Sequence, residues 1–149
     1  MKNSNPTIAQ LNELLAINYE AEKVYLHALN QVESEDLKHF FRARAFERSE
    51  FCRFLGAEII QKGGQPEYLD QRKGGFDKLW VKFKQVVSKK DEYAIFDEVC
   101  KIKTWSVKKY NKVLKKFRFS ENISQLLQNQ RDTLERSMHS MQIGNRRIA

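Results

Sequence analysis

The sequence predicts an all-α protein built as a bundle of four long helices, and three observations support this fold class. Apolar residues recur at helical spacing along most of the 149 residues. No stretch shows the period-2 alternation and β-branched enrichment of a strand. Only two prolines and six glycines interrupt the chain. Because a chain of this length buries roughly 68–70% of its unfolded surface, we expect one domain over residues 1–149 that needs neither disulfides nor a structural metal.

The first two predicted helices form a hairpin. The first spans about Thr7 to Val32, since its apolar residues follow one another in alternating steps of three and four. Ser34 is the expected N-cap of the second helix, which Gly63-Gly64 ends. The join between the two helices is so short that they must lie antiparallel.

The last two predicted helices form a second hairpin. One spans about Asp91 to Phe117 and the other about Glu121 to Ile143, with Ser120 as N-cap and Gly144 just beyond the C-terminal end. The link between them is again short, which predicts a second antiparallel pair.

A long connection, residues 63–90, separates the two hairpins and contains a short amphipathic helix from Phe76 to Val87. Simple up-and-down neighbours do not need a connection of this length. It suits a crossover that returns along the bundle, which is the ferritin-like arrangement. The helix from Asp91 to Phe117 carries two apolar stripes, so we expect the crossover helix or a second subunit to cover one of them, and we expect a homo-oligomer.

The net charge of +8 is concentrated in one segment. Residues 72–118 hold 15 Lys+Arg against 5 Asp+Glu, and the rest holds 12 against 14. Most of the excess is lysine, whereas arginine is the residue suited to bidentate phosphate recognition. A lysine-rich solvated helix surface is therefore favoured over a nucleic-acid interface, and we expect at most weak, non-specific polyanion binding.

Location and thiol chemistry follow from what the sequence lacks. It contains no apolar run long enough to cross a bilayer and no apolar segment typical of a signal peptide near Met1. Cys52 and Cys100 have no CxxC or Cys/His spacing. We therefore expect a cytoplasmic protein with reduced thiols and no membrane association.

Polar residues inside the predicted apolar stripes are the most informative feature of the sequence. At 100° per residue, eight of them face inward and predict a buried polar network: Asn18, Glu22, Arg44, Glu47, Arg48, Glu98, Gln130 and Arg131. Three carboxylates stand against three guanidiniums. This balance predicts ion pairs in which arginine holds each glutamate ionised, and stranding one partner of such a pair costs around 3–5 kcal/mol.

A metal site is the alternative for these carboxylates. Bundles that hold two iron or manganese ions use glutamates and Glu-x-x-His motifs. None of His27, His39 and His139 faces inward here, so we expect no metal. If iron or manganese does bind, its ligands would come from Glu22, Glu47, Glu50, Glu98 and Glu135. The sequence also lacks a P-loop, GxGxxG, G-x-S-x-G or H-E-x-x-H motif, and it predicts no catalytic residue.

The motif from Leu11 to Asn18, with Glu22 and Tyr25, resembles a bacterial family of the ferritin-like superfamily, catalogued as domain of unknown function 2383. The resemblance continues through Ala45, Arg48, Phe51, the Gly63-Gly64-Gln65-Pro66 turn, Trp80, Lys84, Ala94, Ile95, Glu98, Tyr110 and His139. It implies a four-helix bundle with a crossover and no established activity.

The chain departs from the metal-binding members of that superfamily. Asn18 stands where ferritins and rubrerythrins place a ligand glutamate, and Glu47 to Glu50 replaces their Glu-x-x-His. We therefore expect a non-enzymatic interaction or assembly protein with an unknown protein partner. A carboxylate-bridged metal or redox protein is the first alternative, and a weak polyanion-binding module is the second.

Overall fold

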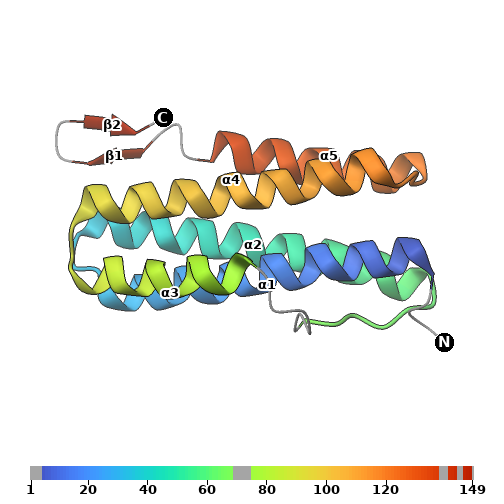
Figure 1. Ribbon diagram of the computed structural model, residues 1–149, viewed down its shortest axis with the longest axis horizontal. Coiled ribbons are helices and arrows are strands. Elements are labelled where there is room, and N and C mark those ends of the chain that lie inside the picture. The colour runs from blue at the N-terminus through green and yellow to red at the C-terminus, as the bar shows by residue number, and fades with distance from the viewer. Residues whose placement is uncertain (1–4, 69–74, 138–140, 144–145, 149) are drawn as a thin grey trace.

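The computed structural model describes residues 5–68, 75–137, 141–143 and 146–148. In these ranges five helices precede a two-stranded hairpin: α1 (Pro6–Gln31), α2 (Glu35–Gln61), α3 (Gly75–Ser88), α4 (Glu92–Lys116), α5 (Glu121–Arg136), β1 (Met141–Ile143) and β2 (Arg146–Ile148). The helices lie roughly parallel to one long axis (Figure 1). The prediction of a helical protein is confirmed.

The α1–α2 hairpin follows from its caps. Pro6 opens α1, and the Asn5 side chain accepts a hydrogen bond from the Thr7 amide at 2.8 Å. Ser34 caps α2 by accepting from the Leu37 amide at 3.3 Å, as the sequence predicts. Only residues 32–34 separate the two helices, which run in opposite directions (Figure 1).

The remaining helices pack around this hairpin. α4 and α5 run antiparallel to each other, and α4 runs in the same direction as α2 (Figure 1). Helix α3 lies alongside α1 and α4 and extends the predicted crossover helix by one residue at each end. Its Phe83 and Val87 are buried in the same cluster as Phe96 of α4, so α3 covers part of the second apolar stripe. The other part, Val107 and Leu114, packs in a cluster with residues of α5.

The last predicted helix is too long. Helix α5 ends at Arg136 instead of Ile143, and residues 141–143 pair with residues 146–148 as antiparallel strands. Strands of three residues are too short to leave a period-2 pattern, although the intervening Gly144-Asn145 is a dipeptide of the residue types that favour hairpin turns. Gly144, the expected C′ residue, lies outside the described residues.

The hydrophobic core consists of two buried clusters. One includes Tyr25, Phe41 and Phe83, and the other includes Leu11, Leu55 and residues of α5. Buried polar side chains interrupt this apolar interior between the helices. No helix in the described part of the chain is both long and apolar enough to span a membrane.

Candidate functional site

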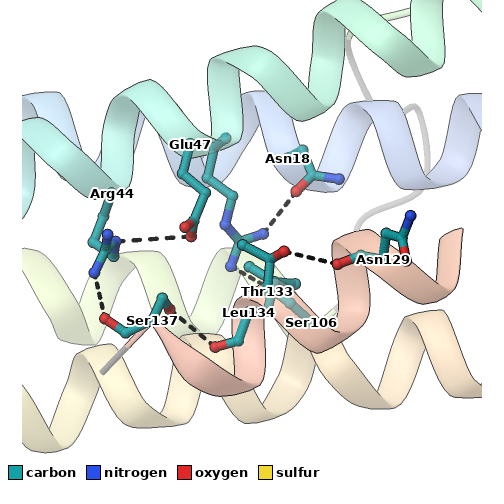
Figure 2. Close-up of polar contacts among 9 residues, drawn as sticks. Asn18, Arg44, Glu47, Ser106, Asn129, Thr133, Leu134 and Ser137 are labelled. Atoms are coloured by element: carbon teal, nitrogen blue, oxygen red, sulfur yellow. Dashed lines mark hydrogen bonds and ion pairs between the residues drawn. The ribbon is translucent and has the colours of Figure 1, made fainter. Parts of the chain in front are cut away.

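A buried arginine lies at the centre of the polar interior. Arg48 of α2 is only 1% exposed. One guanidinium nitrogen donates to Asn18 Oδ1 of α1 at 2.9 Å, and another donates to Ser106 Oγ of α4 at 3.1 Å (Figure 2). Both partners are fully buried and neutral. No carboxylate among the described residues lies within ion-pair distance of Arg48, so its side-chain hydrogen bonds go to neutral groups, while the Glu47 carboxylate attracts it from farther away.

The same side chains also bond to the backbone and to a tyrosine. Asn18 Nδ2 donates to Leu14 O at 2.8 Å and to Tyr110 Oη at 2.9 Å. Ser106 Oγ donates back to Ile102 O at 2.9 Å. The amide and the hydroxyl are therefore oriented before they meet the arginine, which lowers the cost of holding a buried cation.

Helix α5 joins this arrangement through one residue. Tyr110 Oη donates to Gln130 Oε1 at 2.5 Å, and Gln130 Nε2 donates to the Phe51 carbonyl at 3.4 Å. The set Asn18, Arg48, Ser106, Tyr110 and Gln130, here named the Arg48 network, thus connects α1, α2, α4 and α5. A one-residue shift of any of these helices would break at least one buried hydrogen bond, so the network fixes their register.

Two tyrosines next to Arg48 stay protonated. Burial raises the pKa of Tyr110 and of Tyr25 above the ordinary value, and the Arg48 charge opposes this only in part. The Tyr25 ring centroid lies 6.0 Å from the guanidinium carbon, within the range of a cation–π contact. The protonated Tyr110 hydroxyl is the state that donates to Gln130.

Arg44 and Glu47 form a separate pair on α2. Their closest nitrogen and oxygen atoms are 3.7 Å apart, and Arg44 also donates to the Ser137 carbonyl (Figure 2). Burial raises the pKa of Glu47, while the charges of Arg44 and Arg48 lower it to a smaller extent. Desolvation therefore outweighs the attraction within this pair.

Neither Glu98 nor Arg131 has the partner that the predicted Glu–Arg pairing requires. Glu98 accepts a hydrogen bond from Lys101 at 2.9 Å and pairs with Lys82 of α3 at 3.6 Å, because it lies on the α3 side of α4. Arg131 bonds to Asp132 at 3.2 Å and to Asn111 at 3.0 Å. The prediction of an arginine partner for Glu98 is wrong, because the side of α4 that carries Glu98 faces α3 and not the arginines of α2 and α5.

The carboxylates of the alternative metal site also have separate partners. Burial raises the pKa of Glu22, opposed by a hydrogen bond with Ser49. Glu50 pairs with Arg53 at 2.6 Å, and Glu135 is exposed. In the described ranges no three or more His, Cys, Asp or Glu residues gather as a metal site.

The donors around Arg48 do not suit iron or manganese. They comprise two amides, two hydroxyls and a guanidinium, whereas these metals are bound by carboxylate and imidazole groups. A fixed positive charge would also repel a divalent cation at close range. The residues present therefore do not fit the two-metal centre that a ferritin-like fold implies.

Sequence reasoning missed two members of the Arg48 network. Ser106 and Tyr110 lie within about 80° of Ile102 at 100° per residue, on the inward stripe of α4. The signal was present, but a serine and a tyrosine on an apolar stripe are usually simple packing residues. Their importance depends on Arg48 and Asn18, which come from other helices.

The two cysteines do not form a reactive site. Cys52 is buried, and its thiol lies 3.7 Å from the Leu15 carbonyl. Burial raises the pKa of Cys52 to about 12, with a contribution from the Glu22 charge. Cys100 is half-buried on α4, and burial raises its pKa as well. Neither thiol is an activated nucleophile.

Comparison with known proteins gives one match. Searches of curated proteins and of solved structures found no match. A comparison with protein families matches residues 6–116 to the family described as Domain of unknown function (DUF2383). These residues run from the start of α1 to the end of α4, and so include every member of the Arg48 network except Gln130. The chain therefore belongs to this family of unknown function.

Proposed function

We propose that the chain is a ferritin-like four-helix bundle that acts as a non-enzymatic interaction or assembly protein, with no resident iron or manganese. The order and direction of the helices support the fold assignment. Helices α2 and α4 run in the same direction, so the connection between them returns along the bundle, and it contains α3 (Figure 1).

The single observation that carries the functional proposal is the burial of Arg48 among neutral partners. Arg48 fills an interior position between the helices, and its hydrogen bonds to Asn18 and Ser106 hold α1, α2 and α4 together. Buried polar groups of this kind contribute to a unique register more than to net stability. This arrangement supports a structural role for the core, and we therefore look for the function on the surface.

Assembly with a second copy is the role that the surface supports best. Phe46 and Ile60 of α2 are 66% and 63% exposed. With the exposed Ala57 they fall within about 60° of one another at 100° per residue, and we name these three residues the α2 outer face. Phe46 and Ile60 stand about 21 Å apart along α2 and the exposed Arg53 shares their face, so a partner would meet two separate apolar contacts with a cation between them.

Light scattering coupled to size-exclusion chromatography tests this proposal. We expect a dimer or larger assembly that Phe46→Asp and Ile60→Asp each convert to a monomer. Val81→Asp, at a 55% exposed apolar position on α3, is the matched control and should leave the mass unchanged. A monomeric wild-type chain over micromolar to millimolar concentrations would contradict assembly through this face.

A further inference from the structure

A groove between α3 and α4 has an apolar floor and a cationic rim. Its volume is about 590 Å³. Leu79, Cys100 and Trp105 supply apolar surface, and all three are half-buried against the hydrophobic core. The volume lies within the roughly 300–1,000 Å³ range of small-molecule pockets.

Three lysines line this groove, and their charges are unequally balanced. Lys82 and Lys101 share the buried carboxylate of Glu98. The hydrogen bond with Glu98 raises the pKa of Lys101, which keeps it protonated. Lys108 also lines the groove, is exposed, and forms no ion pair with any described residue. Three lysines against one carboxylate leave the groove with an excess of two positive charges, of which one lies at Lys108 and one is shared by Lys82 and Lys101.

Two of the lysines and part of the apolar floor lie along one short stretch of α4. From Cys100 to Lys108 the groove follows α4 for eight residues, about 12 Å at 1.5 Å per residue. Lys101 and Lys108 stand about two helical turns apart on the same side of α4, with Trp105 between them. An anionic group bound at Lys108 would thus leave an attached apolar chain lying over Trp105 and Leu79.

We propose that this groove binds a single-chain amphiphile with an anionic head, of which a fatty acid is the simplest example. The head pairs with Lys108, and the chain covers the apolar surface of Leu79, Cys100 and Trp105. Charge complementarity favours this occupant over a neutral lipid or a cationic amphiphile, and the small volume favours it over the helix of a partner protein. The proposal does not depend on the assembly proposed above.

Dodecanoate below its micelle concentration is the probe. Cys100 reports on the groove, because Cys52 is buried and these are the only two cysteines of the chain. We expect saturable 1:1 binding by calorimetry, and at least fivefold slower alkylation of Cys100 by N-ethylmaleimide at saturation. Dodecanol and dodecyltrimethylammonium should bind at least tenfold more weakly than dodecanoate.

Charge variants test the site of the head group. Lys108→Glu should weaken dodecanoate binding at least tenfold, whereas Lys115→Glu, the same charge change at an exposed position near the end of α4, should weaken it less than twofold. Thr104→Trp places a large ring at the exposed rim of the groove and should abolish binding without touching the core.

Three results would overturn the proposal. The first is absence of saturable dodecanoate binding to the wild-type chain. The second is an equal effect of Lys108→Glu and Lys115→Glu, which would show general charge attraction. The third is binding of an acidic amphipathic peptide that Thr104→Trp abolishes, under conditions where dodecanoate does not bind. That result would make the groove a protein interface.

Discussion

Removal of one buried hydroxyl provides a quantitative test of the Arg48 network. In Tyr110→Phe, Asn18 Nδ2 keeps its bond to Leu14 O, but Gln130 Oε1 loses its donor. Gln130 is 3% exposed, so water does not readily replace that donor. A lost hydrogen bond contributes about 1 kcal/mol, and an unsatisfied buried acceptor costs about 1–3 kcal/mol.

We therefore expect Tyr110→Phe to lower the free energy of unfolding by about 2 kcal/mol. For a chain of this size that corresponds to a fall in Tm of roughly 4–8 °C. Urea denaturation followed by circular dichroism measures the change, provided that the slope of the unfolding free energy against urea concentration is the same in the variant and the wild type. Tyr68→Phe is the control, because Tyr68 is 45% exposed, and it should change stability by less than about 0.5 kcal/mol.

A double variant distinguishes the hydrogen-bond argument from a packing effect. Replacing both partners by apolar groups can be nearly neutral, so Tyr110→Phe/Gln130→Met should be more stable than Tyr110→Phe alone. A single-variant loss below about 0.5 kcal/mol, or a double variant less stable than Tyr110→Phe, would refute the reasoning.

Three further predictions follow from the described geometry. Glu47→Gln should gain stability relative to wild type as pH rises from 4 to 7. The raised pKa of Glu47 in the folded state stabilises the wild-type protein below the unfolded pKa, and this stabilisation is lost as the carboxyl ionises. Equal pH profiles of the two proteins in guanidinium unfolding would contradict this. In native protein at pH 7.5, mass spectrometry after maleimide treatment should find one adduct, on Cys100, and two adducts only after denaturation; rapid native modification of Cys52 would contradict its burial. Asp91→Ala should cost about 1 kcal/mol in urea unfolding, since the Asp91 carboxylate accepts hydrogen bonds from the Tyr93 and Ala94 amides; an unchanged midpoint would show that this cap contributes nothing.

The helices could be predicted from local sequence because local rules determine them. Ser34 and Ser120 cap the helices that they were expected to cap, and the predicted ends of the first four helices differ from the observed ends by only one or two residues. The C-terminal strands were missed because apolar spacing in Leu134 to Ile143 continues the helical pattern. A three-residue hairpin has too few residues to override that pattern.

Pairing between helices could not be predicted in the same way. Helical angles placed eight polar side chains at inward positions. Four of them are buried, namely Asn18, Arg48, Glu98 and Gln130, and four are only half-buried, namely Glu22, Arg44, Glu47 and Arg131. Angles alone do not give the height of each residue along the bundle, and that height determines which side chains meet. Instead of the expected Glu–Arg pairs, Arg48 therefore has neutral partners and Glu98 has lysine partners.

The surroundings of Glu47 determine how much stability its replacement should cost. A fully buried Glu47–Arg pair predicts that Glu47→Gln destabilises the fold by about 3 kcal/mol. Because burial raises the pKa of Glu47 despite two nearby arginines, its ionised form is held less favourably than in water. At neutral pH Glu47→Gln should therefore destabilise the fold by well under about 3 kcal/mol.

Metal binding to the untagged protein tests the central claim most directly. Elemental analysis should find no stoichiometric iron or manganese, and anaerobic addition of Fe(II) should leave Tm unchanged, because Arg48 and its neutral partners fill the interior between α1, α2, α4 and α5. Stoichiometric iron or manganese in the purified protein, with a rise in Tm on Fe(II) addition, would contradict the account and restore a carboxylate-bridged metal site.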